Sequence, residues 1–152
     1  MKNWLKMVPL LLVILVGCSD KEEAGAKQVV HKDPDLKVSD TFTTGSYKMI
    51  GDEGRLGFIY GKAATLKAGE LNKYMWHFWG AEDELDGRFK VIGTNQDTKE
   101  EVVVFETNEL AGAHNGADAH AASSMQLPSS GTWELDAYVG GDLFGTVVVE
   151  VE

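Results

Sequence analysis

The sequence contains very little cysteine: Cys18 is the only one among 152 residues. A single thiol excludes a disulfide within the chain, so the folded part depends on its core for stability. The chain also lacks an apolar run of about 20 residues, the length that a membrane-spanning helix needs. Its most apolar stretch, Val8–Val16, is too short to cross a bilayer.

Basic residues are also scarce, with 14 Lys and Arg against 24 Asp and Glu and a formal net charge of −10. This acidic surface repels phosphate backbones, which argues against nucleic acid as a partner. The sequence has no Gly-x-Ser-x-Gly, no His-Glu-x-x-His and no phosphate-binding loop. We therefore expect a protein that is not an enzyme and that carries no cofactor.

The N-terminus has the layout of an export signal. Lys2 and Lys6 precede the apolar stretch, and Leu15-Val16-Gly17 ends it directly before Cys18. This segment resembles the bacterial lipobox, which implies that the Cys18 thiol receives a diacylglycerol and that the chain is cut before it. Palmitate and the other acyl chains of such an anchor hold a protein stably when two or more are present. The prediction is a lipoprotein signal peptide over 1–17 and a lipid-anchored protein on the extracytoplasmic side of the cell membrane.

Residues 18–40 read as a flexible tether. They are rich in charged and small residues, and Asp33-Pro34-Asp35 interrupts any helix. As a coil, about 20 residues span roughly 25 Å. Removal of residues 1–17 takes away two basic residues and no acidic ones, so the remaining chain has a net charge near −12. We expect His31 to be solvated and the body to stand clear of the bilayer.

Residues 41–152 show short alternating runs between turn residues, and no long run with a 3.6-residue apolar period. About seven such strands indicate an all-β, antiparallel β-sandwich. The predicted strands cover residues 48–50, 55–60, 72–79, 88–94, 101–105, 131–139 and 143–151.

Two of these strands carry clear predictions about burial. The strand 131–139 should bury Trp133, Leu135, Ala137 and Val139 on one face. The strand 143–151 should bury Leu143, Val147, Val149 and Val151. The strand 72–79 is apolar on both faces, which is typical of a central strand.

The segment Leu127–Leu135 is similar to the pattern near the penultimate strand of immunoglobulin-like domains. Trp133 takes the place of the corner tyrosine there, and Leu135 that of the second cysteine. A tryptophan has no hydroxyl for the backbone bond of a tyrosine corner. More narrowly, Ala119–Met125 and Ala137–Gly145 resemble an uncharacterised family of Bacillus surface lipoproteins with an immunoglobulin-like domain of unknown function. The resemblance implies fold and location and lends no catalytic residues.

The stretch 114–125, expected to be a loop, holds the candidate metal ligands. Two imidazoles and a carboxylate lie within seven residues and could converge on Zn²⁺ or Cu²⁺, and a following thioether would favour Cu(I). The alternative is a small-residue surface loop with solvated histidines. The candidate ligands are His114, Asp118, His120 and Met125.

Other candidates are the acidic segment 82–87 and the aromatic strand. Clustered carboxylates suit Ca²⁺, although the spacing of a calcium loop is absent and a solvated connection is the alternative. We expect Trp76 in the core, Trp79 more exposed at the strand end, and His77 partly buried with a hydrogen bond to a neighbouring strand.

The sequence thus predicts a membrane-anchored extracytoplasmic lipoprotein that acts as a non-enzymatic binding or interaction module of the cell envelope. Its partners would be the membrane, through the lipid at Cys18, and an envelope protein, a wall polymer or an exported ligand. The contact surface would be formed by the loop 114–126 and the hairpins at the strand ends. The alternative is an exported metal-binding or metallochaperone module that uses the 114–125 loop.

Overall fold

The computed structural model describes residues 36–61 and 65–152, and within these ranges nearly all regular structure is β-strand. The one helical segment there is the three-residue 3₁₀ helix η1 (Glu82–Glu84), and no helix is long and apolar enough for a membrane crossing. The strands are β1 (Thr41–Thr44), β2 (Tyr47–Asp52), β3 (Leu56–Ile59), β4 (Asn72–Phe78), β5 (Phe89–Asn95), β6 (Glu101–Thr107), β7 (Ala119–Met125), β8 (Gly131–Val139) and β9 (Asp142–Val151). The predicted signal peptide, Cys18, His31 and most of the tether lie outside the described residues.

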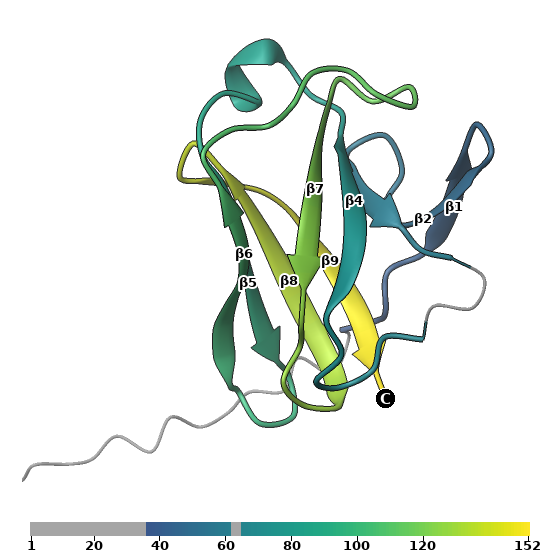
Figure 1. Cartoon of the computed structure of the whole chain (residues 1–152), viewed down its shortest axis with the longest axis vertical. Helices are drawn as coiled ribbons and strands as arrows, with labels where there is room; N and C mark the ends of the chain where they lie inside the picture. Colours follow the sequence, from purple (N-terminus) through teal and green to yellow (C-terminus); the bar gives the residue numbers. More distant parts are fainter. Residues whose placement is uncertain (1–35, 62–64) are drawn as a thin grey trace, which may run out of the picture.

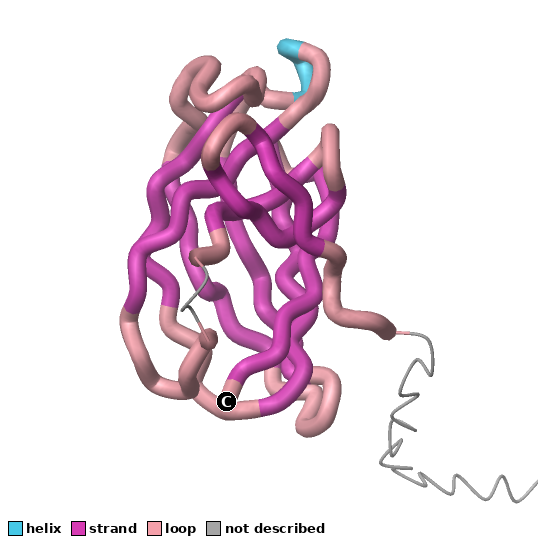
Figure 2. Tube along the Cα trace, turned by 90° about the vertical axis from the view of Figure 1, so that its right-hand side faces the viewer, coloured by secondary structure: helices cyan, strands magenta, loops and turns pink. Residues whose placement is uncertain are grey.

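The strands form two antiparallel sheets that pack face to face (Figures 1 and 2). One sheet has the order β1-β2-β3-β4-β7 and the other the order β6-β5-β8-β9. The predicted all-β class and the immunoglobulin-like antiparallel sandwich are therefore confirmed. The predicted central position of β4 is also confirmed, since β3 and β7 pair with it on either side.

Aromatic rings fill the space between the two sheets. Trp76 of β4 lies with its ring centroid 4.8 Å from that of Phe58 in β3 and 5.7 Å from that of Phe89 in β5. Phe78 of β4 lies 5.0 Å from Phe89 and 5.4 Å from Phe144 of β9. Four of these five rings are fully buried and Phe144 nearly so. The ring contacts thus join both sheets without a covalent link, and the predicted burial of Trp76 is confirmed.

The strand β8 alternates as the sequence predicts. Trp133, Leu135, Ala137 and Val139 are buried, and the residues between them are partly exposed. The indole N–H of Trp133 donates a hydrogen bond of 2.9 Å to the carbonyl oxygen of Ser129. The tryptophan therefore replaces the hydroxyl of a tyrosine corner with its own N–H, and the bond to the upstream backbone is retained.

The predicted loop over 114–126 is wrong in its second half, because residues 119–125 form β7 and pair with β4 along its length. This strand contains none of the β-branched or aromatic residues that mark strands in a sequence. Small side chains are required there because Ala121 pairs with Trp76 and Ser123 with Tyr74. The Ser123 hydroxyl also accepts the indole N–H of Trp76 at 3.2 Å.

The predicted buried face of β9 is wrong at its first residue. Leu143 is 55% exposed, whereas Phe144 is buried. The register explains this: Ala137 pairs with Gly145 and Tyr138 with Leu143, so Phe144 is an extra residue in a β-bulge. A bulge shifts the alternation by one residue, and Val147, Val149 and Val151 are buried as predicted.

The ring contacts predict a large stability cost for the central tryptophan. Replacing Trp76 with alanine should lower the free energy of unfolding by about 3–5 kcal/mol, because it leaves a cavity and removes the indole N–H that donates to Ser123. Urea unfolding at equilibrium measures this. Leu71→Ala, at a side chain that is 66% exposed, is the control and should change stability by less than about 0.5 kcal/mol. Equal effects of the two substitutions would contradict the assignment of Trp76 to the core.

Candidate functional site

Three connections meet at one end of the sandwich, which we call the loop end (Figure 1). They are the segment with η1 after β4, the long connection between β6 and β7, and the turn between β8 and β9. The described chain begins and ends in the opposite half of the molecule (Figures 1 and 2). There Ser39 N–H donates to the carbonyl of Val148, and Val148 N–H donates to the Ser39 hydroxyl, both at 2.9 Å.

The loop end contains an open hollow of about 890 Å³, which we call the acidic groove. Its apolar lining comes from Leu85, Leu110 and Ala119, all of them partly or fully buried. Its charged lining consists of four exposed carboxylates, those of Glu82, Asp83, Asp86 and Asp118. The groove therefore offers negative charge beside apolar surface.

A second hollow of about 420 Å³ adjoins the first, because Asp83 and Asp86 line both. Leu143, Phe144 and Asp142 contribute to its other wall. The bulge in β9 is what turns Leu143 outward to this position. Arg55 and Glu84 also line this hollow as an ion pair, so the carboxylates of Asp83, Asp86 and Asp142 leave it acidic. The two hollows together extend the acidic surface across the segment that contains η1.

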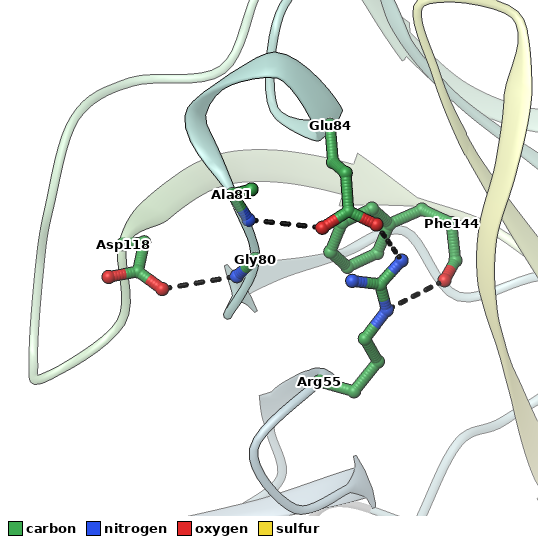
Figure 3. A network of polar contacts seen from close by, with 6 residues as sticks. All are labelled: Arg55, Gly80, Ala81, Glu84, Asp118 and Phe144. Carbon is green, nitrogen blue, oxygen red and sulfur yellow. Dashed lines mark hydrogen bonds and ion pairs between the residues drawn. The ribbon is translucent and has the colours of Figure 1, made fainter.

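Arg55 holds η1 against β9 (Figure 3). Its Nε donates to the Phe144 carbonyl at 3.1 Å, and its Nη2 donates to Glu84 Oε1 at 3.0 Å. The guanidinium carbon lies 3.6 Å from the centre of the Phe144 ring. Glu84 Oε2 accepts the N–H of Ala81 at 3.0 Å. These hydrogen bonds, that from Arg55 foremost, lower the pKa of Glu84, so this carboxylate stays charged and bound within the protein.

Asp118 closes the other side of the same network. Its Oδ2 accepts the N–H of Gly80 at 3.1 Å (Figure 3). The N–H of Asp118 donates to the Phe78 carbonyl at 2.9 Å. An added Cβ at Gly80 would lie 3.1 Å from Glu84 Oε2 and 3.2 Å from Arg55 Nη1. A side chain at position 80, which lines the groove, would therefore crowd Glu84 and Arg55.

The connection before β7 folds as a small hairpin over residues 111–120. Ala111 pairs with His120, and His114 pairs with Ala117. The turn between them is Asn115-Gly116, with positive φ angles of 50° and 81°. Asn-Gly is the preferred pair for such a tight turn because both residues tolerate these angles. This hairpin supplies one wall of the groove through Ala111, Gly112 and Asp118.

The hairpin is fastened to the outer face of β4 by two side chains. Trp79 Nε1 donates to the Gly116 carbonyl at 2.8 Å. The Asn115 side-chain amide lies 3.2 Å from His77 Nε2, and His77 Nδ1 lies 3.1 Å from the Met75 carbonyl. Because a carbonyl only accepts, Nδ1 carries the proton and Nε2 accepts from Asn115. Burial is the main cause that lowers the pKa of His77, and the nearby His114 and His120 lower it further.

The structure brings together two of the four candidate metal ligands. The rings of His114 and His120 lie 4.7 Å apart between centroids, and His120 Nδ1 lies 2.7 Å from the Gly112 carbonyl. Asp118 is instead bonded to Gly80, and Met125 is buried at the far end of β7. Within residues 36–61 and 65–152, no group of three or more His, Cys, Asp or Glu side chains is arranged to hold a metal ion.

The remaining sequence candidates divide between core and loop end. Trp79 is partly exposed, as expected, and His77 is more deeply buried than expected, with partners on its own strand and on the hairpin rather than on a neighbouring strand. In the acidic segment 82–87, Glu84 forms an ion pair with Arg55. The sequence does not predict the roles of Arg55 and Phe144, because no motif marks either residue. The hairpin at 111–120 could have been predicted from Asn115-Gly116, a pair typical of tight turns.

Taken together, the fold and this end define an all-β sandwich domain whose loops form an acidic, partly apolar surface. A family described as "Domain of unknown function (DUF4871)" matches residues 27–149, and the chain belongs to that family. The resemblance to an uncharacterised family is thereby confirmed. No curated protein matches the chain.

Among solved structures, the chain is similar to a crystal structure described as that of "a Putative Lipoprotein from Bacillus anthracis". The two share 22% sequence identity with a TM-score of 0.61, over 80% of this chain and 89% of the other. At this identity the likeness establishes a shared fold.

Burial of His77 predicts a pH-dependent stability. Since its pKa in the folded protein lies below the ordinary 6.5, the unfolded chain takes up the proton first as the pH falls. The free energy of unfolding should therefore be highest above about pH 6.5 and should decrease as the pH drops toward the folded-state pKa. Urea unfolding between about pH 7.5 and pH 5.5 measures this decrease.

The variant His77→Gln should flatten this pH dependence, whereas His31→Gln, outside the described residues, should leave it unchanged. An equally steep decrease in His77→Gln would show that another group causes it.

Proposed function

We propose that the protein is a lipid-anchored extracytoplasmic lipoprotein whose sandwich domain binds a partner with its loop end and catalyses no reaction. The observation that carries the binding role is the position of the acidic groove, at the end of the sandwich opposite the half in which the described chain begins. A tether that leads to that half would leave the loop end facing away from the membrane.

Support for the anchor comes from the sequence and from the comparison. The lipobox-like Leu15-Val16-Gly17-Cys18 places the only thiol where the modifying enzymes act. The Bacillus anthracis protein with a similar fold is described as "a Putative Lipoprotein". The sequence has about 20 residues, many of them charged or small, between Cys18 and the domain, a length that would let the domain reach a partner.

Support for a binding role rather than catalysis comes from the composition of the loop end. Glu84 forms an ion pair with Arg55, and Asp118 Oδ2 accepts the backbone N–H of Gly80. The buried histidine, His77, is held by Met75 and Asn115 and does not line the groove. The groove thus combines exposed charge with apolar surface, as interaction surfaces do.

The anchor predicts the outcome of cell fractionation. Wild-type protein should sediment with membranes, and Cys18→Ala should move to the soluble fraction or the medium because no acyl chain holds it. Ser19→Ala is the matched control at the next residue and should behave as wild type. Retention of Cys18→Ala in the membrane at the wild-type level would contradict the anchor.

The binding role predicts site-specific crosslinking in intact cells. Gly112 lines the groove, and an added Cβ there meets no atom within 4 Å, so a photoreactive amino acid can replace it without strain. Light should give a discrete crosslinked species from position 112. The same amino acid at Leu71, which is 66% exposed on the opposite half, should give none. Equal crosslinking from the two positions, or none from 112, would contradict a contact at the loop end.

A further inference from the structure

Most carboxylates of the acidic groove have no basic partner within the described chain. Ion pairs among the described residues include Lys37–Asp40, Arg55–Glu84 and Arg88–Glu106. In residues 36–61 and 65–152, no Lys or Arg lies within ion-pair distance of Glu82, Asp83 or Asp86. These three exposed carboxylates are therefore open to an external cation.

The spacing of the carboxylates argues against a single metal ion. A cation such as Ca²⁺ needs six to eight oxygens converging at about 2.3–2.6 Å. No set of three or more such side chains converges in the described part of the chain. Charges that are spread along a surface instead match a ligand whose positive charges are also spread, as they are along a basic polypeptide.

The apolar lining of the groove favours Lys and Arg side chains over a small cation as the ligand. Leu85, Leu110 and Ala119 lie beside the carboxylates of the groove. Lys and Arg side chains have apolar stems with charged ends, so each stem can cover apolar surface while its end meets a carboxylate. A small hydrophilic cation would leave this apolar lining exposed to water.

The two adjoining hollows indicate an extended segment. Asp83 and Asp86 belong to both hollows, and Leu143 and Phe144 provide apolar lining in the second. In an extended chain, side chains on one face recur about every 6.5–7 Å, so one segment can place side chains in both hollows. The net charge of −10 also attracts such a segment from a distance.

Resting on the proposed binding role, we infer that the acidic groove and its adjoining hollow bind an extended cationic polypeptide segment. Its Lys or Arg side chains pair with Glu82, Asp83 and Asp86, and its apolar side chains contact Leu85, Leu110 and Leu143. The partner is thus a protein with an exposed basic and apolar strand or tail.

The test uses full-length protein in a non-ionic detergent and a fluorescein-labelled octapeptide of alternating lysine and leucine as the probe. Fluorescence anisotropy at low salt should show saturable binding that weakens as salt is added. The double variant Asp83→Asn, Asp86→Asn should bind about fivefold to tenfold more weakly, the effect of two exposed charge pairs. Both side chains are exposed, so these near-isosteric changes leave the fold intact.

A second double variant, Glu70→Gln with Glu101→Gln, removes the same charge from exposed positions outside both hollows. It should bind the peptide within about twofold of wild type. An equal loss in both double variants would mean that overall charge, and not the groove, attracts the peptide, and would overturn the inference.

Two further probes test the chemistry of the partner. A glutamate–leucine octapeptide should not bind, and a lysine–glycine octapeptide should bind more weakly than the lysine–leucine one. Equal binding of the lysine–glycine peptide would overturn the role of the apolar lining. Crosslinking from position 112 in cells without peptide binding in solution would show that the groove has another partner, whereas loss of both would also remove the proposed binding role.

Discussion

The structure depends on the contact between two sheets that no covalent bond joins. Cys18 lies before the sandwich, so no disulfide can bridge the sheets as it does in many extracellular sandwiches. Aromatic rings from both sheets make this contact instead. One sheet contributes Phe58, Trp76 and Phe78, and the other contributes Phe89 and Phe144. Within the described residues, every buried side-chain nitrogen and oxygen also has a hydrogen-bond partner. Apolar packing with complete polar pairing is what keeps such a core in one arrangement.

The same core determines the shape of the loop end. Phe144 enters the core because β9 carries one extra residue, and the bulge that admits it also turns Leu143 outward. Arg55 then lies over the Phe144 ring and holds Glu84, which positions η1. On the other side, β4 presents His77 and Trp79 to the hairpin over 111–120. The acidic groove is thus bounded by segments that are each bonded to a core strand.

The sequence predicts most of this architecture where local pattern and burial agree. Buried and partly exposed side chains alternate along strand β8, because one face packs against the core and the other faces solvent. The alternation of apolar and polar residues in the sequence predicts this pattern. The sequence does not predict strand β7, because its residues are small and have low strand propensity. Their small size instead fits the positions paired with Trp76 and Tyr74 of β4. The position of Leu143 depends on a bulge, which is a property of the paired strands and not of β9 alone.

At the loop end, too, the sequence predicts some features, and only the folded structure shows the others. The sequence places charged and imidazole side chains in the right connections, but only folding decides which of them meet. Arg55 and Glu84 are 29 residues apart, and His77 and Asn115 are 38 apart. Asp118 is close in sequence to His114 and His120, yet the hairpin turns it toward Gly80. Contacts between distant segments require the register of the sheets, which composition and spacing do not supply.

The central claim is that the core strands hold the loop end as a defined surface, and backbone hydrogen exchange of the intact protein tests it most directly. The account predicts the slowest exchange for amides of β4, β5 and β8, and measurable protection for the hydrogen-bonded amides of Ala111, Ala117, Asp118 and His120. Exchange of these four amides at the rate of an unstructured chain, while the strands stay protected, would contradict it.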